Sequence, residues 1–414
     1  MTESAKFPFR TLLPLAIATI FSIFAMGVII PILPFFVISL GGDAAHAPYI
    51  FSAFSLAALL SAPLWGAMSD RYGRKTILLI SMVGTLLSYA WLGFADSLWQ
   101  LYAARMVAGL SAGWMATLQA YVADVTNDDQ RAKGMGLMGA SFGIGFTFGP
   151  AMGALIMSSD RLADGGMLPV AAYHIPSLIA LISSGLSLLV IGFFLTSPSI
   201  QHQNQALQKQ IGQYGVIARW FSPDALRNRK ILSLLLLYFS VFLVFTAIEG
   251  VFAIWAAAKL GYGPKQVGYL LAYGGFITIL VQGGLIGRLS KSIGEVNCVK
   301  LALLSLFLAL FSFIIADGIL MLLLGMGLLA LAMGLHNPGM QSLISKAAPD
   351  HHKGRVLGTA QSVMSLARVL GPAWGGIVFG LYGVSAPYMV GLIAIACIGI
   401  FGSHYLSSFT LTRR

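Results

Sequence analysis

Apolar segments long enough to cross a membrane follow one another along almost the entire chain. A transmembrane helix needs about 20 apolar residues, and twelve such segments can be delimited, separated by polar loops. Because lipid offers the backbone no hydrogen-bonding partner, segments of this length are expected to be helical. The sequence therefore predicts an all-α integral membrane protein with twelve transmembrane helices. They lie near residues 11–39, 48–69, 76–95, 99–123, 134–158, 170–196, 230–258, 265–287, 298–316, 319–345, 355–381 and 386–408.

The composition agrees with a chain that faces lipid. Hydrophobic residues make up 57% of the 414 positions and charged residues only 9%, whereas soluble domains carry roughly 25% charged residues. The first segment lacks the short apolar core and cleavage site of a secretory signal peptide, so we expect it to be retained. Cys298 and Cys397 both lie in apolar segments without metal-type spacing, so we expect no metal and no cofactor.

One motif occurs twice, 222 residues apart. Gly-Pro-Ala-Met-Gly at residues 149–153 recurs as Gly-Pro-Ala-Trp-Gly at residues 371–375. We interpret the chain as a duplication of two pseudo-symmetric six-helix bundles, residues 1–196 and 230–414, joined by a cytoplasmic linker at residues 197–229. Parallel repeats of this kind build alternating-access transporters, because two similar bundles can rock about a site between them.

The net charge of +11 reflects topology rather than nucleic-acid binding. With a cytoplasmic N-terminus, twenty of the 25 Lys and Arg residues fall in loops or tails on that side, and only Arg161, Lys259 and Lys265 fall opposite. The other two, Arg105 and Arg368, lie within apolar segments. This positive-inside bias predicts a multi-pass protein of the inner (plasma) membrane with both termini cytoplasmic, in contact with membrane lipid and not with nucleic acid.

The loop between the second and third segments carries a recognisable motif. Its pattern matches, at its Gly, Asp, Arg, Gly and Arg positions, the signature loop of the major facilitator superfamily, and residues 287–294 echo it in the second half. The resemblance implies a conformational gate; the alternative is a solvated turn. The gate residues would be Gly66, Asp70, Arg71, Gly73, Arg74 and, at the end of the fourth segment, Asp124.

The fifth segment carries Gly145, Gly149, Pro150 and Gly153, which resemble the antiporter motif of the drug:proton antiporters in that superfamily. Glycines spaced along one face form a groove for a partner helix, and the proline bends its own helix. Close packing alone is the alternative. The N-terminal half is similar to tetracycline/proton antiporters over most of its length, and the C-terminal half matches the superfamily only in outline. The resemblance implies the major facilitator fold.

Two charged residues within the segments are candidates for proton coupling, because intramembrane charges are costly and usually functional. Glu249 is the only acid well inside a predicted segment, and it could take up and release a proton there. Arg105 resembles the buried basic residue of the superfamily's proton-coupled members. The segment at 11–39 lacks the acid that tetracycline exporters carry before their Pro-x-x-Pro end. Either Glu249 has taken over coupling or the protein is a uniporter.

Polar and aromatic side chains stranded in apolar segments predict the lining of a substrate cavity, since they would be costly facing lipid. His336 is a second titratable candidate, although a packed histidine bonded to a neighbouring helix is the alternative. The predicted lining residues are Gln119, Tyr121, Tyr238, Phe242, Tyr273, Gln282, His336, Asn337 and Arg368.

These features predict a secondary transporter, not an enzyme. Gly-Leu-Ser-Ala-Gly at residues 109–113 has the spacing of a hydrolase nucleophile elbow, but it lies in an apolar segment instead of a strand-turn-helix. The chain also has no phosphate-binding loop for ATP. We expect a monomer that exports small amphipathic compounds in exchange for protons. The alternatives are a substrate-specific carrier of a sugar, metabolite, siderophore or lipid, a uniporter, and a non-transporting receptor on the same fold.

Overall fold

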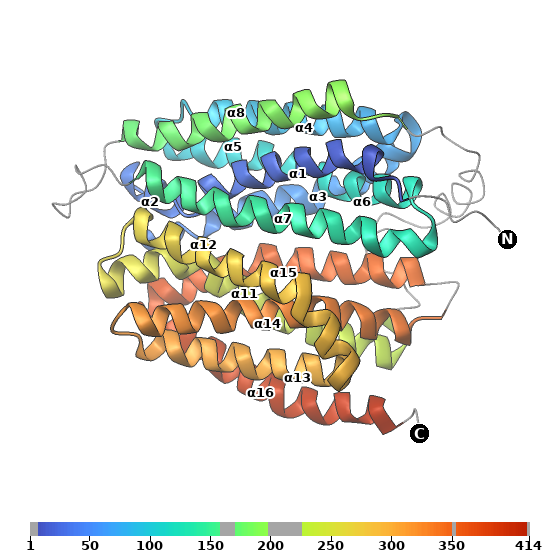
Figure 1. Cartoon of the computed structure of the whole chain (residues 1–414). Helices are drawn as coiled ribbons and strands as arrows, with labels where there is room; N and C mark the ends of the chain where they lie inside the picture. Colours follow the sequence, from blue (N-terminus) through green and yellow to red (C-terminus); the bar gives the residue numbers. More distant parts are fainter. Residues whose placement is uncertain (1–6, 158–169, 198–225, 350–352, 412–414) are drawn as a thin grey trace.

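A computed structural model describes residues 7–157, 170–197, 226–349 and 353–411, and within them the chain is helical and contains no strand. The helices lie side by side along one direction (Figure 1), with α1 to α8, here called the N half, above α11 to α16, the C half. The predicted boundaries at residues 196 and 230 stay a prediction, and most of the linker lies outside the described residues.

The N half begins with two helices where one was predicted, and its fourth predicted segment is also divided in two. Its elements are α1 (Phe9–Ile29), α2 (Leu33–Ser39), the short 3-10 helix η1 (Ala44–His46), α3 (Tyr49–Tyr72), α4 (Arg74–Leu92), α5 (Leu98–Leu110), α6 (Trp114–Val125), α7 (Asp128–Ile156) and α8 (Val170–Phe194).

The C half is built from longer, more continuous helices. Its elements are α11 (Arg229–Leu260), α12 (Pro264–Leu280), the π-helical turn η4 (Val281–Leu285), α13 (Ile286–Ile315), α14 (Ile319–Ala347), α15 (Lys353–Tyr382) and α16 (Ala386–Leu411). Gly294 interrupts α13 with φ 79° and ψ 161°, so the part before it continues the eighth predicted segment and the part after it is the ninth.

Nine stretches of the described chain are long and apolar enough to cross a membrane, and three features account for the difference from twelve. The stretch Pro264–Ile315 contains two predicted segments that meet at Gly294. The fourth predicted segment is divided into α5 and α6, each too short to span alone. The last, Ala386–Gly402, is short only within the residues described for it. The twelve-helix prediction is therefore confirmed.

Both helix breaks in the N half have local causes. Pro31 lies in the break between α1 and α2, and Pro34 is the second residue of α2; proline removes backbone hydrogen bonds there. Between α5 and α6, the indole Nε1 of Trp65 donates a hydrogen bond of 2.6 Å to the carbonyl of Leu110. Ser111 thus lies in the turn between two helices and not in a hydrolase elbow, since no strand precedes it in the described chain.

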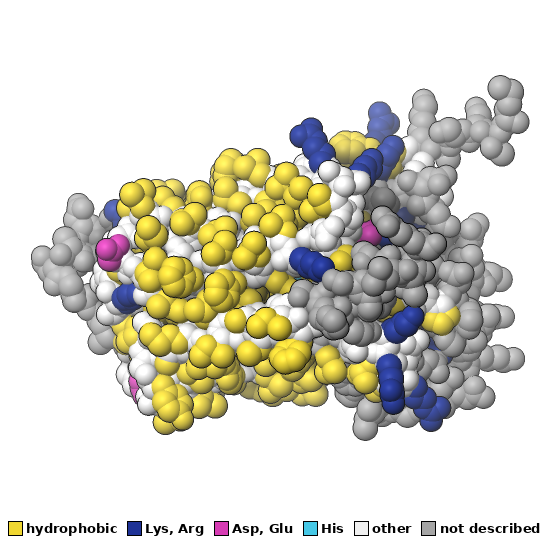
Figure 2. Space-filling view, turned by 90° about the horizontal axis from the view of Figure 1, so that it is seen from below, with side chains coloured by type: hydrophobic (Ala, Val, Ile, Leu, Met, Phe, Trp, Pro, Cys, Tyr) yellow, Lys and Arg dark blue, Asp and Glu magenta, His cyan; other side chains and the backbone are white. Residues whose placement is uncertain are grey.

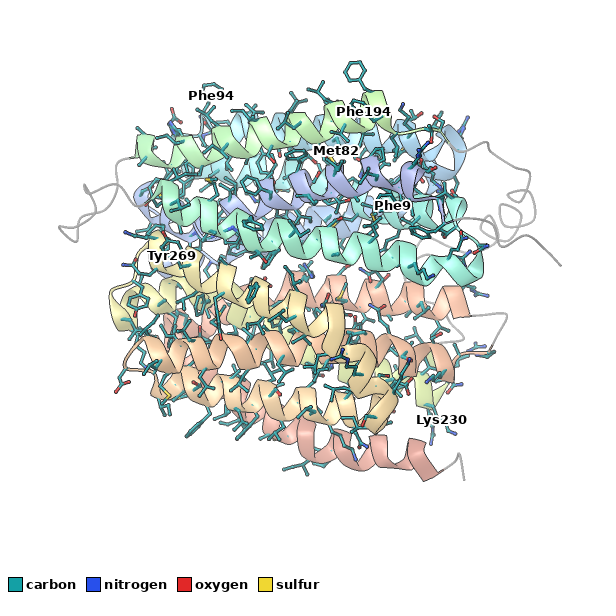
Figure 3. All side chains as sticks on the ribbon, in the orientation of Figure 1. Phe9, Met82, Phe94, Phe194, Lys230 and Tyr269 are labelled. Carbon is teal, nitrogen blue, oxygen red and sulfur yellow. The ribbon has the colours of Figure 1, made fainter. Side chains whose placement is uncertain are left out.

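Large apolar side chains cover the flanks of the helices. Phe94 and Phe194 point away from the outer face of the N half (Figure 3) and are 73% and 68% exposed. In the view of Figure 2, hydrophobic side chains cover the body and Lys and Arg gather at one end. That end, which also holds the loop around Gly73 and the start of α11, is called the basic end below. An apolar belt between polar ends is the surface that a bilayer requires.

The halves contact each other mainly at the end opposite the basic end. A Cβ at Gly376 of α15 would lie 2.6 Å from the carbonyl oxygen of Ala45, and one at Gly268 of α12 would lie 2.7 Å from that of Pro150. The interface helices α3, α7, η4, α13 and α15 also carry glycines nearer the basic end, where an added Cβ would meet no atom within 4 Å. These are Gly66, Gly136, Gly139, Gly283, Gly284, Gly287 and Gly358. The structure is therefore closed opposite the basic end.

Candidate transport site and gate

Four of the predicted lining residues gather between α11 and α14. The hydroxyl of Tyr238 donates a hydrogen bond of 2.6 Å to the side-chain oxygen of Asn337. The Tyr238 ring stacks on His336 with ring centroids 5.7 Å apart and meets Phe242 edge-on at 5.1 Å. Aromatic faces and hydrogen-bonding tips in one cluster suit an amphipathic molecule, which needs both kinds of contact.

His336 is fully buried in this cluster. Neither of its ring nitrogens has a hydrogen-bond partner in the described part of the protein. The alternative interpretation, a histidine bonded to a neighbouring helix, is therefore not what this structure contains. A buried imidazole without a partner carries an energetic cost that a water molecule or a bound ligand can remove.

Sequence inspection missed Gln341 as a member of the same cluster. Its side-chain Nε2 donates a hydrogen bond of 2.9 Å to the oxygen of Asn337, which also accepts from Tyr238. The available signal was its position four residues after Asn337, on the same face of α14. The amide of Asn337 is thereby held in one orientation by two donors.

Glu249 lies on the face of α11 that also carries Tyr238, Phe242 and Phe245, since these positions are three or four residues apart. Its side chain is exposed although both sequence neighbours are buried. Arg368 of α15, also exposed, interacts with it electrostatically, and the same positive charge acts on Tyr238. Glu249 and Arg368 thus lie close enough to interact electrostatically, although they form no direct ion pair in this structure.

Arg105, the other predicted coupling residue, lies elsewhere. It is 4% exposed, its guanidinium carbon sits 4.7 Å above the centre of the Phe54 ring, and its electrostatic partner is Tyr89. All three residues belong to the N half, on α5, α3 and α4. The structure therefore brings Glu249 together with Arg368 and not with Arg105.

The remaining predicted lining residues are dispersed. Tyr121 is buried at the end of α6, and its hydroxyl donates a hydrogen bond of 2.8 Å to the carbonyl of Thr196. Tyr273 packs on α14 at Gly327, and Gln282 is exposed in the π-helical turn. Gln119 is exposed on α6. In the described part of the chain, none of these residues forms a hydrogen bond or a ring contact with the Tyr238 cluster, which consists of Tyr238, Phe242, His336, Asn337 and Gln341. The polar contacts of the candidate site therefore come from the C half.

The predicted gate residues converge at the basic end. Arg74, the first residue of α4, donates hydrogen bonds of 2.8 Å to Asp124 at the end of α6 and 2.6 Å to Asp70 near the end of α3. It also bonds to the hydroxyl of Ser69. Charge-assisted bonds of this kind are the strong ones, so one guanidinium ties three helix ends together.

The other gate residues shape this cluster or surround it. Gly73 has φ 89° and ψ 151°, a backbone region that L side chains rarely adopt, and so it permits the sharp turn from α3 into α4. Arg71 is exposed with its guanidinium 5.2 Å from the centre of the Tyr72 ring. A Cβ at Gly66 would meet no neighbour.

The predicted antiporter motif packs α7 onto α1 through backbone contacts. A Cβ at Gly145 would lie 2.7 Å from Cβ of Ile23, and one at Gly149 or Gly153 would lie 2.7 Å from the carbonyl oxygen of Phe24 or Val28. These helices therefore approach as closely as glycine allows.

Pro150 lies at the same contact and connects it to the interface between the halves. A Cβ at Gly27 of α1 would lie 2.8 Å from Cδ of Pro150. The carbonyl four residues before a proline loses its helical donor, and here that carbonyl belongs to Phe146. It faces Gly275 of α12, where an added Cβ would lie 2.9 Å away. Close packing and the backbone carbonyl left without a helical donor thus coincide where the halves meet.

Comparison with known proteins identifies the class that this fold and these sites define. The Major Facilitator Superfamily model matches residues 15–372 and 302–411. The chain therefore belongs to the major facilitator superfamily, a family of transporters and not of enzymes, and it is a multi-pass membrane protein.

Individual relatives resemble the chain over nearly its full length. It is 28% identical to the class C tetracycline resistance protein of Escherichia coli, covering 91% of this chain and 90% of that protein. It is 27% identical to multidrug resistance protein 2 of Bacillus subtilis, covering 94% of each. Among solved structures, the human organic anion transporter MFSD10 (TETRAN) has a TM-score of 0.70 at 25% identity, covering 96% of this chain and 99% of that one. A D-xylose-proton symporter, at 15% identity and a TM-score of 0.74, shares the fold.

Proposed function

We propose that this protein exports small amphipathic compounds in exchange for protons, by alternating access between two states. The observation that carries the proposal is Glu249, an exposed carboxyl group in the middle of α11, beside Arg368 and on the face that holds the Tyr238 cluster. An intramembrane acid with a positive partner can change its charge as it takes up a proton. The relatives named for tetracycline and multidrug resistance support the export of such compounds.

The group that binds the proton and the residues that bind the substrate would lie in the same part of the C half. With Glu249 ionised, the positive charge of Arg368 is balanced. With Glu249 protonated, Arg368 is unbalanced, and the electrostatic environment of Tyr238 changes as well. A ligand that interacts differently with these two charge states shifts the equilibrium between them, which is what coupling requires.

Proteoliposomes with an imposed pH gradient test this proposal. Wild-type protein should accumulate a fluorescent amphipathic compound and move protons in the opposite direction. Glu249→Gln, which mimics the protonated state, should still exchange the compound across the membrane but should not accumulate it. Full proton-driven accumulation by Glu249→Gln would contradict the proposal and direct attention to His336.

A carrier specific for organic anions is the second candidate. It is favoured by Arg368, an exposed cation beside the aromatic cluster, and by the likeness to an organic anion transporter. The same vesicles distinguish the two candidates when loaded with matched anionic, neutral and cationic aromatic compounds. Transport confined to the anions, and independent of the pH gradient, would favour the carrier.

We also infer that the basic end faces the cytoplasm, because Lys and Arg collect on the cytoplasmic side of membrane proteins. That the protein acts as a monomer in the inner membrane stays a prediction. Reporter fusions after residues 43, 162 and 317 should report an external location, and fusions after residues 73, 210 and 350 an internal one. An external signal from residue 210 would contradict the arrangement of two six-helix bundles.

A further inference from the structure

One polar group of the Tyr238 cluster has a fixed orientation that the proposed function does not yet use. The side-chain oxygen of Asn337 accepts hydrogen bonds from the hydroxyl of Tyr238 at 2.6 Å and from Nε2 of Gln341 at 2.9 Å. An amide oxygen has two lone pairs, so both are occupied. The two donors therefore hold the oxygen of Asn337 toward themselves and leave its nitrogen on the other side of the amide.

The nitrogen of this amide has no partner. Nδ2 carries two N–H donors, and neither forms a hydrogen bond in the described part of the chain. Nδ2 is also absent from the buried side-chain atoms that lack a partner, a group that includes both ring nitrogens of the neighbouring His336. Because Asn337 is half-buried, its nitrogen is accessible to a molecule outside the packed interior.

Aromatic rings lie beside the amide. Tyr238, which binds the oxygen of Asn337, meets Phe242 edge-on with ring centroids 5.1 Å apart, and Phe242 meets Phe245 edge-on at 6.0 Å. The three rings are spaced three or four residues apart on α11 and so share one face. Phe245 is half-buried, so this face is not fully covered. An accessible N–H group beside a row of rings fits a flat aromatic molecule with a hydrogen-bond acceptor at its edge.

The neighbouring charges indicate that this side of the cluster does not face lipid. The positive charge of Arg368 acts on both Tyr238 and Glu249, and both charged residues are exposed. Exposed charges within a membrane protein face the interior of the bundle or a water-filled cavity. The acceptor that meets Nδ2 of Asn337 therefore comes from water or from a molecule in that interior, since lipid tails have none.

We propose that Asn337 is a specificity-determining residue, whose Nδ2 donates a hydrogen bond to a carbonyl or carboxylate oxygen of an aromatic substrate. Gln341 is a positioning residue that keeps this nitrogen turned toward the substrate. The substrate class is thus narrower than amphipathic compounds in general. The inference rests on the proposed function, because it concerns the same cluster, but it requires neither proton coupling nor the charge of Arg368.

The fixed orientation gives the amide its selectivity. A free asparagine can present either its oxygen or its nitrogen, and so it binds donors and acceptors alike. Here, presenting the oxygen would break the bonds from Tyr238 and Gln341. The hydroxyl of Tyr238 would keep only the sulfur of Met364, at 3.5 Å, which is a weak acceptor. A ligand whose only polar group is a donor therefore gains nothing from Asn337.

Two uncharged compounds of nearly the same shape test this proposal. 9-Fluorenone carries a carbonyl group where fluorene carries a methylene group. Saturable binding of each radiolabelled compound is measured at equilibrium on the protein in lipid nanodiscs, and binding to protein-free nanodiscs is subtracted. Wild-type protein should bind fluorenone about two- to tenfold more tightly than fluorene, the factor that one hydrogen bond supplies.

Asn337→Asp separates the donor from the rest of the side chain. The carboxylate has nearly the same size, and one of its oxygens still accepts from Tyr238 and Gln341, but the other oxygen replaces the donor. The preference for fluorenone should disappear. The affinity for fluorene should stay close to that of the wild type, which shows that the variant is folded. Gln341→Met should lower the preference without abolishing it, because Tyr238 alone then holds the amide.

Gln282→Glu is the matched control. It makes the same change from amide to carboxylate at an exposed position of the C half, and Gln282 forms no hydrogen bond with the Tyr238 cluster in the described part of the chain. This variant should keep the wild-type preference for fluorenone. An equal loss of preference in Gln282→Glu and Asn337→Asp would show that the added charge is responsible, and it would overturn the proposal.

The outcomes separate this proposal from the proposed function. Equal affinities of the wild type for the two compounds, or a preference that survives Asn337→Asp, would overturn the role of Asn337 alone. Wild-type protein that binds neither compound saturably would overturn it as well. In each case, proton-driven accumulation in vesicles decides the proposed function separately, because that measurement uses neither fluorenone nor fluorene.

Discussion

The N half and the C half share one packing scheme but differ in chemistry. A Cβ at Gly27 of α1 would lie 2.8 Å from Pro150 of α7, and one at Gly250 of α11 would lie 2.8 Å from Pro372 of α15. By this correspondence Glu249, the residue before Gly250, takes the place of Met26, the residue before Gly27. The scaffold repeats because close backbone contacts tolerate only glycine, whereas the residue beside such a contact can differ between the copies.

The halves also differ in the continuity of their helices. The first and fourth segments of the N half are broken into α1 and α2 and into α5 and α6, while their counterparts α11 and α14 run without a break from Arg229 to Leu260 and from Ile319 to Ala347. The unbroken pair carries Glu249, His336 and the Tyr238 cluster. Rigid helices hold side chains at fixed separations better than interrupted ones, which suits the half that holds the candidate chemistry.

The strongest test of this comparison moves the acid from one half to the other. Glu249→Gln should reduce proton-driven accumulation to the passive level. Adding Met26→Glu should restore part of it, because the repeat places both residues beside the same Gly-Pro contact. The measurement is accumulation in vesicles at a fixed pH gradient, with Met26→Gln as control. No recovery in the double variant, at normal expression, would show that the halves are not equivalent at this position.

A second test compares the two intramembrane arginines. Arg368→Gln should lower proton-coupled transport by about tenfold, because it removes the positive charge that interacts electrostatically with Glu249. Arg105→Gln should have the smaller effect on coupling, since its contacts are Phe54 and Tyr89. Proton movement per transported molecule is the quantity to compare. A larger coupling defect in Arg105→Gln than in Arg368→Gln would mean that Arg105, and not Arg368, is the arginine that controls proton coupling.

The third test concerns the packing that the halves share. Gly149→Ala would place a Cβ 2.7 Å from the carbonyl oxygen of Phe24, and overpacking of this kind typically costs about 1–3 kcal/mol. Gly139→Ala on the same helix meets no neighbour and should leave stability unchanged or raise it slightly. Thermal unfolding in detergent measures both. Equal melting temperatures for the two variants would mean that α7 and α1 are not in close contact.

The smallest expected effect tests the break between α5 and α6, which has no counterpart in the C half. Trp65→Phe removes the hydrogen bond to the carbonyl of Leu110 while keeping most of the ring, and should cost about 1 kcal/mol. Trp374→Phe in α15 serves as a control for losing an indole elsewhere in the protein. Thermal unfolding again provides the measurement. If the Trp65→Phe protein is as stable as the wild type, the hydrogen bond of Trp65 does not stabilise the break between α5 and α6, and the break depends on Ser111 and its neighbours alone.

The helix count was predictable because it depends on local patterns, and Asp70, Arg74 and Asp124 were selected because their motifs resemble those of the family; their role as a gate stays a prediction. Segment length in lipid fixes where helices lie, and the prediction of twelve is confirmed despite the breaks beside Pro31 and at Ser111. Asp70, Arg74 and Asp124 were expected to act together, and the structure joins them through one guanidinium. The breaks themselves were not predicted, because the Trp65 contact that accompanies one of them involves residues 45 positions apart.

The partner of Glu249 could not be predicted from the local sequence. The sequence identified Arg105 and Arg368 as charges within apolar segments, and nothing in their local pattern distinguishes which of them faces the acid. The rotation of α15 against α11, set by Gly371, Pro372 and Gly375, brings Arg368 near Glu249 and leaves Arg105 buried in the other half. Which charges interact depends on helix rotation and on distances across the fold.

The sequence by itself therefore determined the membrane class, the duplication and the family, since hydropathy, charge bias and repeated motifs are properties of continuous stretches. Only the tertiary structure decided that the polar cluster belongs to the C half, that the end opposite the basic end is closed, and that Arg368 and not Arg105 interacts with Glu249. The reason is physical: a contact between residues far apart in the chain leaves no periodic signal in the sequence, and it forms only when the helices that carry its two members are packed.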